Sequence, residues 1–159
     1  MRSILKILMW CVFALIGWSI FSCEEFCEES NRTAMVVNFY SDSAQNVLTM
    51  EKISVETIGS DTILYRNTRT SVVMCPLNPA VDVSAFVFVN DTISDTITVA
   101  YTRHPGFVSS ECGCVNYADI TNIQTTTNSI KKVEITSPNV TPVTYRPNVV
   151  NAENIRVYY

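Results

Sequence analysis

Two neighbouring stretches of this chain alternate between apolar and polar side chains with a period of two. Residues 83–89 and 96–102 are rich in Val, Ile, Thr and aromatic residues, and the polar residues 90–95 separate them. Successive side chains of a strand point to opposite faces of a sheet, so this period places one set inside and the other outside. The two stretches therefore predict an antiparallel β-hairpin with a polar turn.

The other apolar stretches are also short and are bounded by turn-forming residues. They are residues 35–40, 47–58, 63–65, 71–77, 115–123, 130–136 and 155–159. Seven to nine short strands with little helix predict an all-β fold, an antiparallel β-sandwich that is immunoglobulin-like or related, with an open barrel as the alternative. We expect a single domain over residues 33–159.

Local signals refine several of these elements. Pro76 and Pro79 restrict the stretch around them to an edge strand or a loop. Residues 104–107, His-Pro-Gly-Phe, are expected to end the preceding strand, and residues 115–123 form either a strand or one short helical turn.

Residues 66–70 are expected to be a polar loop and residues 137–154 a long irregular connection. The core candidates of the stretch 130–136 are its apolar members, Ile130, Val133 and Ile135.

The first 22 residues have the layout of a secretory signal peptide. A basic start with Arg2 and Lys6 precedes an apolar run over residues 7–21. The sequence Ile20-Phe21-Ser22-Cys23 then resembles a bacterial lipobox, which predicts lipidation of Cys23 and stable anchoring in a membrane. Plain cleavage near Ser22 is one alternative. A retained membrane helix is the other, although fifteen residues rise only about 22 Å against a hydrocarbon core of roughly 30 Å.

An acidic tether over residues 23–32 follows the lipobox. Its four glutamates are Glu24, Glu25, Glu28 and Glu29. They act either as a solvated spacer or as a surface-export signal like that of Bacteroidota lipoproteins. We expect a lipid-anchored protein of the outer membrane, on its periplasmic face or on the cell surface.

Charge and motif content restrict the possible partners. Without residues 1–22 the chain keeps 9 basic and 15 acidic residues, a formal charge of −6. Lys131-Lys132 is its only adjacent basic pair, whereas proteins that neutralise a phosphate backbone cluster Lys and Arg, so we expect no nucleic-acid binding. Four glycines cannot build a glycine-rich phosphate cradle, and we expect no cofactor.

Four cysteines remain once Cys11 is removed with the signal peptide and Cys23 is acylated: Cys27, Cys75, Cys112 and Cys114. An even number in an envelope protein predicts two disulfides, with Cys27–Cys112 and Cys75–Cys114 as the preferred pairs. A four-thiolate zinc site is the alternative. Structural zinc sites usually have two Cys-x2–4-Cys pairs and this chain has one closer pair, so we expect no metal.

No catalytic motif is apparent. The one histidine, His104, lies in a turn-like context with no Ser, Cys or carboxylate patterned around it, and we interpret it as a loop histidine. The scattered acids could pair as glycosidase carboxylates or, for Asp91 and Asp95, hold calcium. We interpret Asp91 and Asp95 as turn residues. The sequence predicts a protein that is not an enzyme.

Four aromatic residues expected near loops are candidates for ligand binding: Tyr65, Phe107, Tyr117 and Tyr145. Exposed rings beside a groove can serve as stacking platforms for a glycan or a small ligand, whereas rings buried in strands serve only the core. We therefore expect either a binding or assembly-support module with an outer-membrane protein partner, or a glycan- or ligand-binding lipoprotein. Coplanar exposed rings would favour the second function and a flat apolar patch the first.

Several short motifs resemble one family. They are the Cys23-x3-Cys27 start, Pro76-Leu77-Asn78, the run Tyr101-x5-Phe107-Val108-Ser109-x2-Cys112-Gly113, Asn128-Ser129-Ile130 and the sequence of residues 154–159. Together they resemble an uncharacterised family of small Bacteroidota lipoproteins, a family of unknown function. The resemblance implies an extracytoplasmic lipoprotein with no known activity. Cys75 and Cys114 look like additions to the family's pattern, which fits an extra disulfide and not a shared active site.

Overall fold

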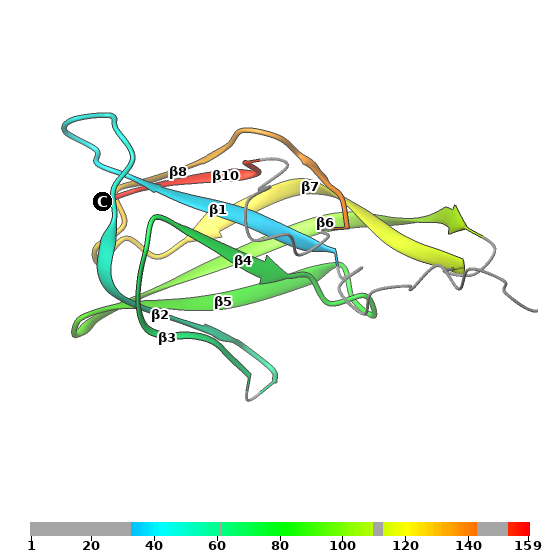
Figure 1. Ribbon diagram of the computed structural model, residues 1–159, viewed down its shortest axis with the longest axis horizontal. Coiled ribbons are helices and arrows are strands. Elements are labelled where there is room, and N and C mark those ends of the chain that lie inside the picture. The colour runs from blue at the N-terminus through cyan, green and yellow to red at the C-terminus, as the bar shows by residue number, and fades with distance from the viewer. Residues whose placement is uncertain (1–32, 61, 110–112, 143–152) are drawn as a thin grey trace, which may run out of the picture.

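The chain folds into two facing β-sheets (Figure 1). The computed structural model describes residues 33–60, 62–109, 113–142 and 153–159, with the backbone alone for residues 107–109 and 113–115. Every regular element in these residues is a strand. The prediction of an all-β, two-sheet, single-domain fold is confirmed.

Ten strands make up the two sheets. They are β1 (Ala34–Tyr40), β2 (Met50–Thr57), β3 (Ile63–Thr70), β4 (Val72–Pro76), β5 (Val83–Asn90), β6 (Ile93–Ser109), β7 (Gly113–Thr125), β8 (Lys132–Ile135), β9 (Asn139–Val140) and β10 (Ile155–Tyr158). One sheet has the order β4-β1-β10-β8 and the other the order β3-β2-β5-β6-β7-β9. Only β1 and β10 pair in parallel within the described sheets. The short β9 lies in the stretch predicted to be irregular and is the strand that the sequence does not predict.

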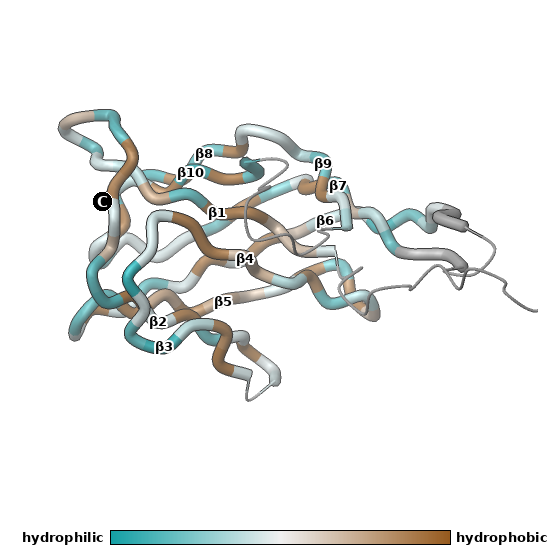
Figure 2. Tube along the Cα trace, viewed as in Figure 1, coloured by the Kyte–Doolittle hydropathy of each residue, from teal (hydrophilic) through white to brown (hydrophobic). Residues whose placement is uncertain are grey.

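The core lies between the sheets because each strand turns one set of alternate side chains inward. Hydrophobic segments follow β1, β4 and β5 in Figure 2. Phe39 of β1 and Phe88 of β5 meet edge to face across the core, with their ring centroids 6.3 Å apart. Burial of each large apolar side chain contributes about 1.5–3 kcal/mol, so the packed sheets dominate the stability of the fold.

The hairpin predicted from residues 83–102 is confirmed as β5 and β6, which pair in continuous antiparallel register. Its predicted inward residues, Ile97, Val99 and Tyr101, are buried. The connection consists of Asp91 and Thr92 alone, shorter than predicted. Asp91 has a φ of 56°, in the left-handed region that Asp tolerates better than most residues, so its role as a turn residue is confirmed. The same prediction is wrong for Asp95, which is a buried residue of β6.

The prediction that β6 ends at residues 104–107 is wrong, because the strand continues to Ser109. Pro105 lies opposite Asn116 of β7, and the carbonyl of Asn116 accepts a hydrogen bond from the hydroxyl of Thr33. That carbonyl thus points away from β6. Pro105 and Asn116 therefore form a non-hydrogen-bonded pair of the antiparallel ladder. The missing N–H of Pro105 therefore costs the sheet nothing.

Two further predictions are corrected at the sheet edges. Residues 66–70, predicted as a loop, belong to β3, an edge strand whose pairing with β2 contains register shifts. Polar and charged residues are common on such edges.

Ile135, predicted in the core, is exposed because it ends the edge strand β8, whereas Ile130 is buried and Val133 packs against the core. The predicted edge position of β4 is confirmed, and residues 115–123 form a strand within β7.

Candidate functional site

A cleft of about 560 Å³ lies at the end of the sandwich where β1 begins. The turn between β2 and β3, the segment after β4, and the strands β6 and β7 form its walls, and Thr33 borders it. At the right of Figure 1, β6 and β7 extend beyond the other strands as a two-stranded ribbon, so the cleft lies where this ribbon leaves the sandwich. Its volume is within the range of small-molecule sites, roughly 300–1,000 Å³.

Tyr101 holds one wall of the cleft in place. Its hydroxyl donates to the backbone carbonyl of Asn78 (2.9 Å), so the hydroxyl of Ser84 must donate to Tyr101 over 2.8 Å. Ser84 also accepts a hydrogen bond from the backbone N–H of Asn78. Tyr101 and Ser84 are both buried, and such closed networks rigidify the segments that they join. The segment after β4 is thereby fixed against β5 and β6.

Arg103 is the one charged residue among the described residues that line the cleft. Its Nε lies 2.7 Å from a carboxylate oxygen of Asp82, and its Nη1 donates to the backbone carbonyl of Pro79. The Arg103 side chain is 30% exposed and that of Asp82 66%, so the pair contributes little to stability. The ion pair matters more for the electrostatics of the cleft, because the Asp82 carboxylate compensates the positive charge of Arg103.

Four polar side chains of the cleft are not used by the fold. The hydroxyls of Thr57, Ser60 and Thr62 and the side-chain amide of Asn116 form no hydrogen bond to another described residue. Behind them, Leu77, Tyr101 and Ala118 form a buried apolar floor. Because these hydroxyls and the amide are not engaged with described groups, they are available to a ligand.

The opposite face of the ribbon carries a second cluster. The rings of His104 and Tyr117 stack at 6.0 Å with an angle of 9°, and His104 Nδ1 lies 3.6 Å from a carboxylate oxygen of Asp119. A Cβ on Gly106 would overlap the Tyr117 ring, so the stack needs a glycine there. Because side chains alternate along β6, His104 faces away from Arg103 and the cleft.

His104 is therefore a strand residue, and the prediction of a loop histidine is wrong. Asp119 reaches it from β7, a contact that spacing in the sequence does not reveal. A histidine beside a carboxylate can act as a general base. Both side chains are about half exposed, at 50% and 46%, and they lie on the ribbon face opposite the cleft.

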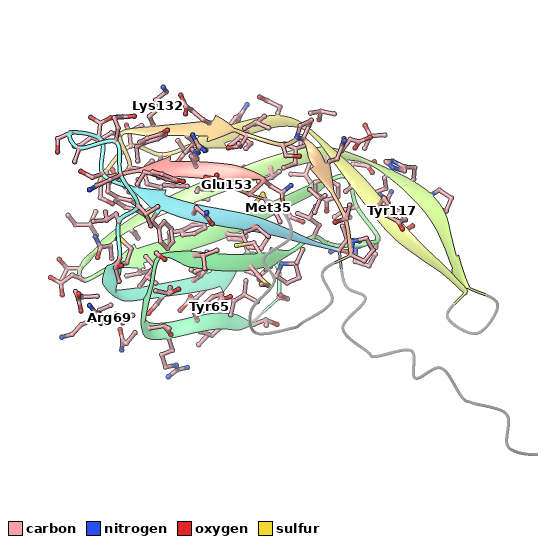
Figure 3. The ribbon with its side chains drawn as sticks, turned by 45° about the horizontal axis from the view of Figure 1, so that its top comes forward. Met35, Tyr65, Arg69, Tyr117, Lys132 and Glu153 are labelled. Atoms are coloured by element: carbon pink, nitrogen blue, oxygen red, sulfur yellow. The ribbon has the colours of Figure 1, made fainter. Side chains whose placement is uncertain are left out.

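The predicted ligand-binding aromatic residues lie at different places. Tyr65 of β3 packs partly against the core, and its hydroxyl accepts a hydrogen bond from the backbone N–H of Met74 over 2.9 Å. Figure 3 shows Tyr117 on the ribbon, well away from Tyr65. Tyr117 is among the residues that line the cleft, but its ring stacks on His104 on the opposite face of the ribbon. Phe107 is described only as a backbone position of β6, and Tyr145 lies outside the described residues. The structure does not bring Tyr65 and Tyr117 together.

Cys75 is the one predicted disulfide cysteine whose side chain is described. It is a buried free thiol on β4, and burial raises its pKa far above the usual range. A thiol held protonated in this way is unreactive. Because the Cys75 thiol is free, the structure does not form the predicted Cys75–Cys114 disulfide. Cys23, Cys27 and Cys112 lie outside the described residues, as does the side chain of Cys114, so the Cys27–Cys112 pair and the lipidation stay predictions.

Asp95 is the most buried acid of the described chain, at 1% exposed. Its carboxylate accepts five hydrogen bonds from the loop between β7 and β8: from Thr126 Oγ1, Asn128 N, Ser129 N, Ser129 Oγ and Ile130 N. Burial raises its pKa, but the bonds from Ser129, Asn128 and Ile130 outweigh burial and lower the pKa to about 2. Asp95 thus organises this loop, and no cluster of potential metal ligands occurs in the described part of the chain.

Several cleft residues escape the sequence analysis. Leu64, Asn78, Arg103 and Asn116 come from four separate segments that meet only in the folded chain. The nearest signal is the pattern Pro76-Leu77-Asn78-Pro79, in which two prolines flank an apolar and an amide residue. Such a segment marks a rigid connection but does not indicate what lies opposite it.

Fold and site together define a small all-β domain, a two-sheet sandwich with a cleft at one end. The chain belongs to the family of unknown function DUF6452, whose model matches residues 52–159. No curated protein and no solved structure matches the chain. Among the described residues, no helix is long and apolar enough to cross a membrane.

Proposed function

We propose that this protein is a lipid-anchored, non-enzymatic binding module of the outer membrane, and that the cleft is its binding site. The observation that carries the proposal is the position of Thr33, which borders the cleft and directly follows the tether in the sequence. Its sequence support is the lipobox at Cys23 and the likeness to Bacteroidota lipoproteins. The anchor and the cleft then belong to the same end of the domain.

The length of the tether limits how far the cleft can lie from the membrane. Thr33 follows Cys23 by ten residues. An extended chain spans at most about 3.3–3.6 Å per residue, so an acylated Cys23 keeps Thr33 within about 35 Å of the lipid surface. The binding site would face components at or near that surface.

The chemistry of the cleft supports binding better than catalysis. Arg103 already bonds to Asp82 and Pro79, and the cleft side chains that have no partner in the described part of the chain are hydroxyls and an amide. Groups of this kind orient and hold a ligand, whereas acid–base catalysis needs a group that titrates near the working pH.

The anchor is tested by metabolic labelling with a radioactive fatty acid in a bacterial host. The wild-type protein should incorporate the label and fractionate with the outer membrane, and Cys23→Ala should do neither. Cys27→Ala serves as the matched control and should be labelled like the wild type. Equal labelling of the Cys23→Ala protein would contradict the anchor.

The cleft is tested by photo-crosslinking in intact cells from an unnatural amino acid at Thr62, on the cleft wall. The control position is Thr92, which is exposed in the turn at the opposite end of the β5–β6 hairpin. Adducts from Thr62 that are missing from Thr92 would support the cleft as the binding site. An adduct with an outer-membrane protein would assign the assembly role, and an adduct with a glycan would assign ligand binding. Identical patterns from both positions, or none, would contradict the proposal.

A further inference from the structure

The same cleft is lined by polar side chains that have no hydrogen-bond partner among the described residues and by buried apolar side chains. Thr57 is the last residue of β2, Ser60 and Thr62 lie in the turn between β2 and β3, and Asn116 comes from β7. We infer that the cleft binds a neutral, hydroxyl-rich saccharide. This inference rests on the proposed function, because it assumes that the cleft is the binding site, and it adds the class of ligand.

The hydrogen-bonding capacity of the walls matches that of sugar hydroxyls. Each Ser or Thr hydroxyl has one donor and two acceptor sites, and the Asn116 amide has both donors and an acceptor. A sugar hydroxyl likewise donates and accepts. A ligand with several neighbouring hydroxyls can therefore pair with the hydroxyls of Thr57, Ser60 and Thr62 and with the Asn116 amide. Each ligand hydroxyl can act as donor or acceptor, as its partner requires.

The charge of the cleft favours a neutral ligand. Among the described residues that line it, Arg103 is the one that is charged, and its charge is compensated by Asp82 at 2.7 Å. The mature chain has a formal charge of −6, which opposes the approach of anionic glycans. No acidic residue lines the cleft to attract a cation, within the residues that the structure describes.

The floor of the cleft suits the C–H groups of a sugar ring. Leu77 and Ala118 are buried beneath the walls, and Leu64, Pro76 and Pro79 add apolar surface at the sides. A saccharide presents C–H groups and hydroxyls within one ring, so one ligand can cover the floor and reach the walls.

An extended peptide fits this site less well. Peptides that bind β-domains commonly pair with the backbone of a free strand edge. Beside the cleft, Pro105 has no N–H to offer on the edge of β6, and the outward carbonyl of Asn116 on β7 already accepts a hydrogen bond from Thr33. The backbone next to the cleft thus gives a peptide little to pair with.

The test uses the mature chain, residues 23–159, with Cys23→Ala to remove the lipid. Binding is measured by isothermal titration calorimetry and by amide chemical shifts. The probes are neutral pentasaccharides of glucose, mannose and xylose, together with anionic pentagalacturonate and a mixture of uncharged pentapeptides. We expect a neutral pentasaccharide to bind and to shift the amide signals of Thr62 and Asn116.

Matched variants show whether such binding uses the cleft. Thr62→Ala and Asn116→Ala should each weaken the affinity by about three- to tenfold, the range of one lost hydrogen bond. Thr98→Ala on β6 and Asn122→Ala on β7 remove the same side chains away from the cleft and should leave the affinity unchanged. Circular dichroism of each variant confirms that it is folded.

Three results would overturn the inference: no binding of the neutral saccharides, preferred binding of the anionic or peptide probes, or equal affinities for cleft and control variants. Its failure is distinguishable from that of the proposed function. If Thr62 still yields specific crosslinks while the neutral saccharides do not bind, the ligand class is wrong and the cleft remains the binding site. If Thr62 also yields no specific crosslinks, both proposals fall.

Discussion

At the scale of single residues, Asp95 shows how one buried carboxylate can replace regular secondary structure. The loop that it binds leads from β7 in the six-stranded sheet to β8 in the four-stranded sheet. Three backbone N–H groups of this loop, those of Asn128, Ser129 and Ile130, have the Asp95 carboxylate as their acceptor. Buried backbone donors left without acceptors would be costly, so Asp95 determines the path of the chain between the sheets.

We predict that Asp95→Asn lowers the free energy of unfolding by about 2–3 kcal/mol. The substitution replaces one acceptor oxygen with an NH2 group that faces donors, and hydrogen bonds to a charged group are worth about 1.5–3 kcal/mol. Urea denaturation followed by circular dichroism measures the change. Asp91→Asn is the matched control, since Asp91 is an exposed turn residue, and it should change stability by less than about 0.5 kcal/mol. Equal effects of the two variants would refute this role.

The low pKa of Asp95 also predicts a loss of stability in acid. Its folded-state pKa of about 2 lies below the value of about 3.9 in an unfolded chain. The charged form therefore stabilises the fold fully above about pH 5, and this contribution of about 2–3 kcal/mol is lost as the pH falls through 4 towards 2. Urea midpoints of the wild type should fall more steeply over this window than those of Asp95→Asn. Parallel curves would contradict the assignment.

At the scale of elements, the strand edges of the two sheets are protected by contacts between them. β3 and β4 are the edge strands of different sheets, and the hydroxyl of Tyr65 on β3 accepts the outward N–H of Met74 on β4. An unpaired edge N–H can recruit another chain, and side chains that cover it reduce this risk. Tyr65, which the sequence places among the ligand-binding candidates, has this edge contact in the structure.

We predict that Tyr65→Phe speeds hydrogen exchange at the amide of Met74 while the fold is kept. The phenyl ring keeps the packing against the core but removes the acceptor, which should cost about 0.5–1.5 kcal/mol. Exchange rates measured by nuclear magnetic resonance test this effect residue by residue. The amide of Leu48, which bonds to the backbone of Phe39, is the internal reference. Unchanged exchange at Met74 would show that Tyr65 does not protect this edge.

Short apolar stretches and the alternation of side chains predict eight of the ten strands, and residues 115–123, which become part of β7, are left open between a strand and a helical turn. The continuation of β6 through Pro105 is not predictable in this way, since it depends on pairing with β7, where Pro105 lies opposite Asn116. The cleft is harder still. Its floor residues, such as Leu77 and Ala118, look like ordinary core residues, and only the topology shows that they meet beneath Thr62 and Asn116.

At the scale of the whole molecule, the first and last strands are neighbours. β10 lies between β1 and β8, parallel to β1 and antiparallel to β8. Its inward residues Ile155 and Val157 are fully buried. Just before β10, the buried Asn154 accepts from the backbone N–H of Val36 and donates to the carbonyls of Ser137 and Asn139. The four-stranded sheet is thus continuous only through this strand.

We predict that deletion of residues 155–159 abolishes cooperative folding. The deletion removes two fully buried side chains and leaves β1 and β8 with unpaired edges inside the sheet. Thermal unfolding followed by circular dichroism should show no transition. Ile135→Ala, which removes an exposed apolar side chain at the edge, is the control and should unfold cooperatively near the wild-type temperature. A cooperative transition of the shortened chain would contradict the role of β10.

The central position of β10 has a consequence for the timing of folding during synthesis. Domains often begin to fold while the ribosome is still making them. Here the sheet lacks a middle strand until residues 155–158 have emerged, so the growing chain cannot close its core early. A nascent chain that stays open in this way can still be threaded through a translocation channel, which passes unfolded polypeptides. If the chain is exported as proposed, this order of the strands keeps it competent for translocation until its last strand has been made.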